Sequence, residues 1–185
     1  MPQPITANTS SKPRHAVLTR PLCALQIAAI VCEWAYVEDM LTLMFSAAMG
    51  SHTLREDGGS NVNRNWTALV AMRELESIHT RLKIVEKTLI PLLPDALQIR
   101  WQSLEKVIRS RARERNLVAH ASWALVDEYP QDLILEDSAG KYFRYSEKDF
   151  VDILGRISNV NIETYQFMEA VLAGQRDGTV NIPTN

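Results

Sequence analysis

The feature that most constrains the fold is the spacing of apolar residues, which recur every three or four positions over four long stretches. Such spacing gathers apolar side chains on one side of an α-helix. It predicts helices over residues 19–49, through residues 75–89, over residues 95–122 and over residues 146–174. A polar stretch, residues 50–63, is expected to form a loop between the first two helices.

The pattern changes after the third predicted helix, where three short runs have the composition of β-strands. These runs are Trp123–Val126, Leu133–Leu135 and Tyr142–Tyr145, and the residues Asp137–Gly140 predict a hairpin turn between the last two. So small a sheet cannot form a core by itself. The expected fold class is therefore all-α: a four-helix up-down bundle with a small β hairpin or meander inserted between helices 3 and 4.

The 185 residues are of a length that fits one domain. Residues 1–18 are rich in Pro, Ser, Thr and Asn, which predicts a flexible N-terminal arm. The helical domain is expected over residues 19–173, with the β insertion at 123–145, and residues 174–185 are expected to form a flexible tail. No internal repeat is apparent.

The first helix is expected to bury one stripe of apolar residues: Leu22, Leu25, Ala29, Cys32, Tyr36, Met40, Leu43 and Ala47. The chain's two cysteines, Cys23 and Cys32, are nine residues apart on this helix, too far to form a disulfide. Free, buried thiols indicate a cytoplasmic location. The apolar run Pro21–Cys32 is shorter than the about 20 residues of a membrane span, so no membrane association is expected. A signal peptide over this region is the alternative interpretation.

Two arginines of the third helix, Arg111 and Arg115, occupy positions where the period calls for apolar residues. A buried charge is costly unless it is paired, so either carboxylates meet these arginines or the bundle opens into a cleft. Residues 100–115 contain six basic and two acidic side chains, a net charge of +4 in a chain of net charge −2. A local basic field on an acidic body suits a polyanion such as RNA. The expected RNA-binding residues are Lys106, Arg109, Arg111 and Arg113.

The stretch Arg115–His120, "RNLVAH", resembles the Arg-Asn-x-x-x-His form of the signature of the HEPN superfamily. The resemblance extends to the position of the motif, late on the third of four long helices, and covers roughly residues 20–173. It implies a four-helix bundle and a metal-independent endoribonuclease. It also implies a homodimer formed through the face that bears Arg115 and His120, and a role as a toxin or phage-defence factor, with an antitoxin or another protein as partner.

The chemistry that the resemblance implies assigns a role to each residue of the motif. The 2′-hydroxyl of RNA attacks the adjacent phosphate, and His120 is expected to act as acid or base because imidazole titrates near neutral pH. Arg115 is expected to stabilise charge on the phosphate, and Asn116 to orient His120 or a phosphate oxygen. No cofactor and no metal are expected, because no metal-ligand spacing occurs.

Two alternatives stay open at this point. His120 is also interpretable as a core histidine that forms a hydrogen bond near a helix end. The alternative function is a catalytically silent HEPN-like module that binds RNA, a nucleotide or a partner protein.

Overall fold

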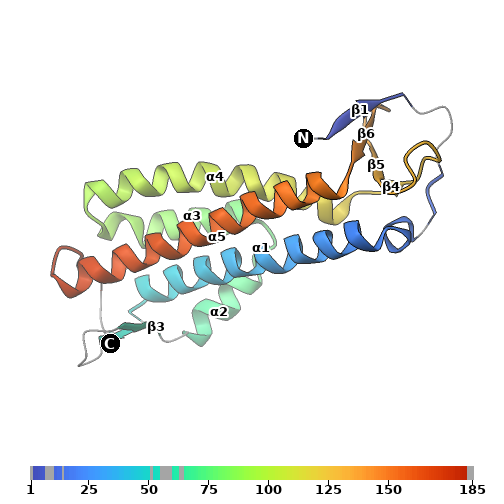
Figure 1. Cartoon of the computed structure of the whole chain (residues 1–185). Coiled ribbons are helices and arrows are strands. Elements are labelled where there is room, and N and C mark those ends of the chain that lie inside the picture. Colours follow the sequence, from blue (N-terminus) through green and yellow to red (C-terminus); the bar gives the residue numbers. More distant parts are fainter. Residues whose placement is uncertain are drawn as a thin grey trace. The chain divides into compact units, whose positions relative to one another are not determined.

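The structure is a computed structural model that describes residues 2–6, 11–13, 15–50, 52–54, 60–62 and 65–182, with only the backbone described for 52–54 and 60–62. Within these residues the chain is mostly helical, with five α-helices (Figure 1). The helices are α1 (Pro21–Ala48), α2 (Trp66–Arg73), α3 (Ile78–Thr88), α4 (Asp95–His120) and α5 (Glu147–Arg176). Two short 3₁₀ helices are η1 (Ala16–Thr19) and η2 (Ile90–Leu92). None of the described helices combines the length and apolar character that a membrane crossing requires.

The chain divides into two compact units. The first comprises Met1–Trp34 and Arg113–Asn159, and the second comprises Ala35–Ala112 and Val160–Asn185. Each of the three longest helices, α1, α4 and α5, contributes one segment to each unit.

The first unit contains a four-stranded antiparallel sheet with the order β1-β6-β5-β4. Its strands are β1 (Gln3–Ile5), β4 (Trp123–Ala124), β5 (Leu133–Glu136) and β6 (Tyr142–Tyr145). The last three confirm the strand runs that the sequence predicts. The expected turn between β5 and β6 is also present: the Asp137 carboxylate accepts hydrogen bonds from the backbone N–H of Ala139 (2.9 Å) and Lys141 (2.8 Å), and Gly140 has a φ of 75°.

The first strand, β1, comes from residues expected to form a loose arm. It pairs with β6 in the register Gln3↔Arg144, and its Ile5 packs against the cluster of Ala124, Val126 and Ile134. Pro4 is tolerated because β1 is an edge strand. Farther along the same arm, Ser11 exchanges two backbone hydrogen bonds with Leu125, of 3.0 and 2.8 Å. The arm is therefore attached to the sheet at β1 and at Ser11.

An aromatic cluster packs the sheet against the first turns of α5. The ring centroid of Trp123 lies 5.2 Å from that of Tyr145 and 5.5 Å from that of Phe150. All three side chains are buried, and Phe150 is 0% exposed. Aromatic burial of this kind supplies much of the apolar area that holds a small sheet to a helix.

The second predicted helix is in fact two helices, α2 and α3. Asn65 and Ser77 cap the two N-termini: the Asn65 side chain accepts from the N–H of Thr67 (2.9 Å), and the Ser77 hydroxyl accepts from the N–H of His79 (3.2 Å). Across the break, Arg81 donates to the Leu75 carbonyl (3.0 Å). The sequence predicts the sheet after the third helix, and the structure corrects this. The break between α2 and α3 adds one helix, so the sheet follows the fourth, α4.

The apolar face of α1 differs from the expected stripe. Leu22, Leu25 and Tyr36 are more than half exposed, and Cys32 is exposed rather than buried. Of the expected stripe, Ala47 is buried. Most of the buried apolar side chains of α1 belong instead to the neighbouring stripe: Cys23, Ile30, Trp34, Val37, Leu41 and Met44. Both cysteines are free, as expected. The apolar residues of α1 cover more than one face, so their period alone does not select the buried one.

The C-terminal segment also packs more closely than a flexible tail would. The last helix does not close at Gly174 but continues to Arg176. Val180 and Ile182 are buried, and the Val180 N–H donates to the Gly174 carbonyl (2.8 Å). A Cβ on Gly174 would lie 2.6 Å from the Val180 side chain, so this close approach requires glycine.

The loop expected at residues 50–63 contains two paired strands, β2 (His52–Leu54) and β3 (Ser60–Val62). The remaining residues 51, 55–59 and 63 lie outside the described part of the chain, as do residues 1, 7–10 and 14 of the arm and 183–185 of the tail.

The aromatic cluster yields a stability prediction. Phe150→Ala leaves a cavity against Trp123 and Tyr145 and should lower the free energy of unfolding by about 3–5 kcal/mol. The adjacent Val151→Ala, at a 44% exposed side chain, should change it by less than about 0.5 kcal/mol. Urea denaturation followed by circular dichroism measures both values, and equal losses for the two variants would contradict the packing.

Candidate active site at the end of α4

His120 is the last residue of α4, and only two residues separate it from the buried Trp123 of β4. The His120 side chain is exposed. The interpretation of His120 as a core histidine is therefore wrong. The short connection fixes the end of the helix against the sheet, so the imidazole is presented to solvent from a well-anchored backbone.

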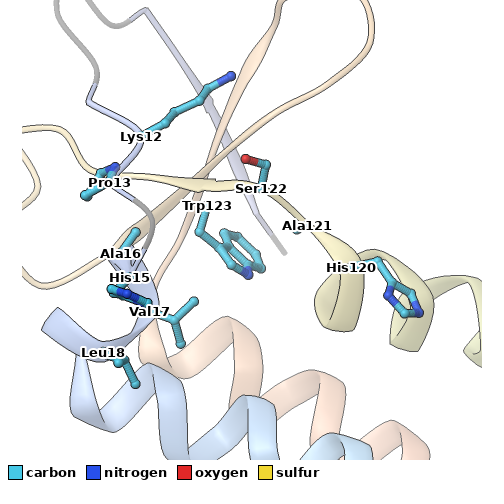
Figure 2. Close-up of a pocket in the computed structure, with 10 residues that line it drawn as sticks. All are labelled: Lys12, Pro13, His15, Ala16, Val17, Leu18, His120, Ala121, Ser122 and Trp123. Carbon is cyan, nitrogen blue, oxygen red and sulfur yellow. The ribbon is translucent and has the colours of Figure 1, made fainter.

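A hollow of about 640 Å³ lies beside His120 in the first unit (Figure 2). This volume falls within the range of about 300–1,000 Å³ that is usual for small-molecule sites. Residues from the arm and from the α4–β4 connection line it: Lys12, Pro13, His15, Ala16, Val17, Leu18, His120, Ala121, Ser122 and Trp123. The hollow thus brings together two segments more than a hundred residues apart in the sequence.

Among the described residues of the arm, Lys12 and His15 contribute polar side chains to the hollow. Lys12 forms a salt bridge with Glu136 of β5, and this bond raises the pKa of the Lys12 ammonium. His15 precedes η1, makes no capping hydrogen bond with its side chain, and is exposed. The buried Ala16, 3% exposed, anchors the backbone beside it. The sequence gives no signal for either residue, because their place depends on pairing between the arm and the sheet.

The other two residues of the motif, Arg115 and Asn116, contact each other. The Arg115 guanidinium donates to the Asn116 side-chain oxygen (3.0 Å). Arg115 is half-buried, and its Nε is buried with no hydrogen-bond partner in the described residues. Asn116 is exposed and lies one turn before His120 on the same face of α4. Neither Arg115 nor Asn116 is among the residues that line the hollow.

The expected RNA-binding residues lie in different surroundings. In the second unit, Lys106 is exposed and Arg111 is half-buried. Arg109, in the same unit, has two side-chain partners: its Nε donates to Glu105 (2.8 Å), and its guanidinium contacts His79. In the first unit, Arg113 is exposed. The contacts of Arg109 restrain its side chain, whereas Lys106 and Arg113 point into solvent, and the binding role of all four stays a prediction.

Comparison of the chain with protein-family models, with curated proteins and with solved structures gave no match. The HEPN resemblance therefore depends on the Arg115–His120 motif and on its place at the end of α4. Among the described side chains, no group of three or more His, Cys, Asp or Glu residues is arranged to hold a metal ion.

The salt bridge at the rim of the hollow gives a direct test of its geometry. Glu136→Gln removes the carboxylate that raises the pKa of Lys12, so this pKa should fall toward the ordinary lysine value. An NMR pH titration of the lysine side chains measures the change. Glu128→Gln, at an exposed glutamate between β4 and β5, is the matched control and should leave the Lys12 titration unchanged. A Lys12 pKa that is the same in both variants would show that the arm does not pair with β5.

Proposed function

We propose that this chain is a HEPN-type, metal-independent endoribonuclease that cleaves RNA at the hollow beside His120. The observation that carries the proposal is the exposed imidazole of His120, held at the end of α4 on a hollow large enough for a nucleotide. The proposed fold is the four-helix up-down bundle of that superfamily. Its four helices are α1, α3, α4 and α5, and the sheet is an addition between the last two.

The chemistry begins with the 2′-hydroxyl of the ribose, which attacks the adjacent phosphorus once a base removes its proton. The 5′-oxygen leaves when an acid supplies a proton to it. His120 is able to serve in either role, because imidazole exchanges protons readily near neutral pH. Negative charge grows on the phosphoryl oxygens in the transition state, and a cation nearby lowers the barrier.

Arg115 is the proposed source of that cation, and the hydrogen bond to Asn116 holds its guanidinium in place. The five residues from Arg115 to His120 correspond to a rise of about 7.5 Å along the helix. The proposal requires the long Arg115 side chain to span this distance to the phosphate at which His120 acts. In the proposed homodimer through the face that bears Arg115 and His120, a two-fold axis brings two copies of His120 to one groove, one for each of the two proton transfers. The homodimer, like an antitoxin or another protein partner, is part of the proposal.

A second candidate function is a catalytically silent module that binds RNA through its basic residues. The observation that favours it is the absence of Arg115 and Asn116 from the residues that line the hollow. Such a module would bind RNA with an affinity that falls steeply with salt, because phosphate contacts release counterions.

Cleavage of single-stranded RNA in the presence of a chelator distinguishes the two functions. The nuclease proposal predicts that His120→Ala lowers the cleavage rate by about 100- to 10,000-fold, the usual loss of a general acid or base. The control is Thr80→Ala, at an exposed residue on α3 in the second unit, which should keep the rate of the unaltered protein. RNA binding without cleavage by the unaltered protein would favour the silent module instead.

A further inference from the structure

The solvent side of the first turns of α1 is apolar. It consists of residues spaced three or four apart, which we call the α1 face: Pro21, Leu22, Leu25, Ala28, Ala29 and Cys32. Leu22 and Leu25 are 57% and 64% exposed, and the others are exposed too, except the half-buried Ala29. The opposite side of the same turns is buried, since Cys23 is 1% and Ile30 0% exposed. A helix that is apolar on all sides is normally buried, so the α1 face is a surface for a partner.

The absence of charge from these turns restricts the chemistry of the partner. Arg20 precedes the α1 face and Glu33 follows it, and no charged residue lies between them. A partner that presented charged groups here would lose their hydration without gaining an ion pair. Helices that lie on a membrane surface are rich in Lys and Arg along their polar side, and residues 21–32 contain neither. Charge complementarity therefore favours a partner with an uncharged, apolar face of its own.

The side chains of the α1 face are large at one end and small at the other. Leu22 and Leu25 belong to the first turns, and Ala28, Ala29 and Cys32 follow them. We propose that the α1 face is a contact between two copies of this chain, which pair antiparallel about a two-fold axis at the level of Ile27.

This axis places the large side chains of one copy against the small ones of the other. Leu22 faces Cys32 of the second copy, Leu25 faces Ala29, and the same pairs recur on the other side of the axis. A parallel pairing would instead set leucine against leucine and leave a gap between the alanines. The size gradient therefore selects a second copy in the antiparallel orientation, since such a face is complementary to itself.

The contact is small, so the pairing is reversible. The helix rises about 17 Å from Pro21 to Cys32. A face of this length buries less than the about 800 Å² per partner of a standard interface and corresponds to a weak dimer. The contact differs from the proposed homodimer face that bears Arg115 and His120, and it does not depend on the proposed nuclease activity.

Disulfide trapping in the full chain tests this pairing, because a covalent bond captures a weak dimer. Leu22→Cys places a thiol opposite Cys32 of the second copy, so mild oxidation should give a covalent dimer on a non-reducing gel. The two thiols of one chain are ten residues apart on one helix, about 15 Å, and cannot bond to each other. The unaltered chain should form no such dimer, because the axis also separates the two copies of Cys32 by about 15 Å.

Matched variants distinguish the pairing from random collision. Val151→Cys, at a 44% exposed position of α5 in the same unit, should give no covalent dimer. Adding Cys32→Ser to Leu22→Cys should abolish the bond, because only positions 22 and 32 are in register. Adding Leu25→Arg to Leu22→Cys should slow dimer formation at least about tenfold, since it buries an unpaired charge. Adding Val151→Arg instead should leave the rate unchanged.

Two results would overturn the inference. One is a covalent dimer that forms as fast from Val151→Cys, or from Leu22→Cys with Cys32→Ser, as from Leu22→Cys alone. The other is no dimer from Leu22→Cys when circular dichroism shows a folded chain and a thiol reagent modifies both cysteines at positions 22 and 32. The cleavage assay with His120→Ala decides the nuclease proposal separately.

Discussion

The burial of Trp123 directly after α4 is the constraint on which the rest of the site depends. The indole packs against Tyr145 of β6 and Phe150 of α5, so one side chain ties the end of a helix to a sheet and to a second helix. Only Ala121 and Ser122 lie between His120 and this anchor. The backbone of His120 consequently has little freedom to move, although the imidazole itself lies in solvent. Binding and catalysis both profit from groups that are held in place before the ligand arrives.

The sheet has a second role, because it captures the N-terminal arm at two places. The strand β1 pairs with β6, and its Ile5 packs against the cluster around Ile134. Farther along the arm, Ser11 pairs with Leu125, just beyond β4. These contacts bring Lys12 and His15 to the hollow beside His120. The small sheet therefore assembles the candidate site from residues of the two separate chain segments that form the first unit.

Local patterns predicted the elements well where the pattern was long or bounded by turn residues. The helix expected from Asp95 to Ser122 is observed from Asp95 to His120, and the turn at Asp137–Gly140 is present. The exposure of His120 and the place of His15 were beyond prediction, because the first depends on tertiary packing and the second on a three-residue strand too short to show a period. The buried face of α1 was missed for a different reason, since apolar side chains on two faces satisfy the same spacing.

The most direct test of the central claim is whether RNA-like phosphate occupies the hollow. Imidazole signals of the full chain are followed by NMR while a single-stranded oligonucleotide with 2′-deoxyribose throughout, which lacks the attacking hydroxyl, is added at low salt. Phosphate bound in the hollow predicts saturable shifts of the His15 and His120 signals, because both residues line it. Signals of His15 and His120 that stay fixed while the oligonucleotide binds elsewhere would contradict the account.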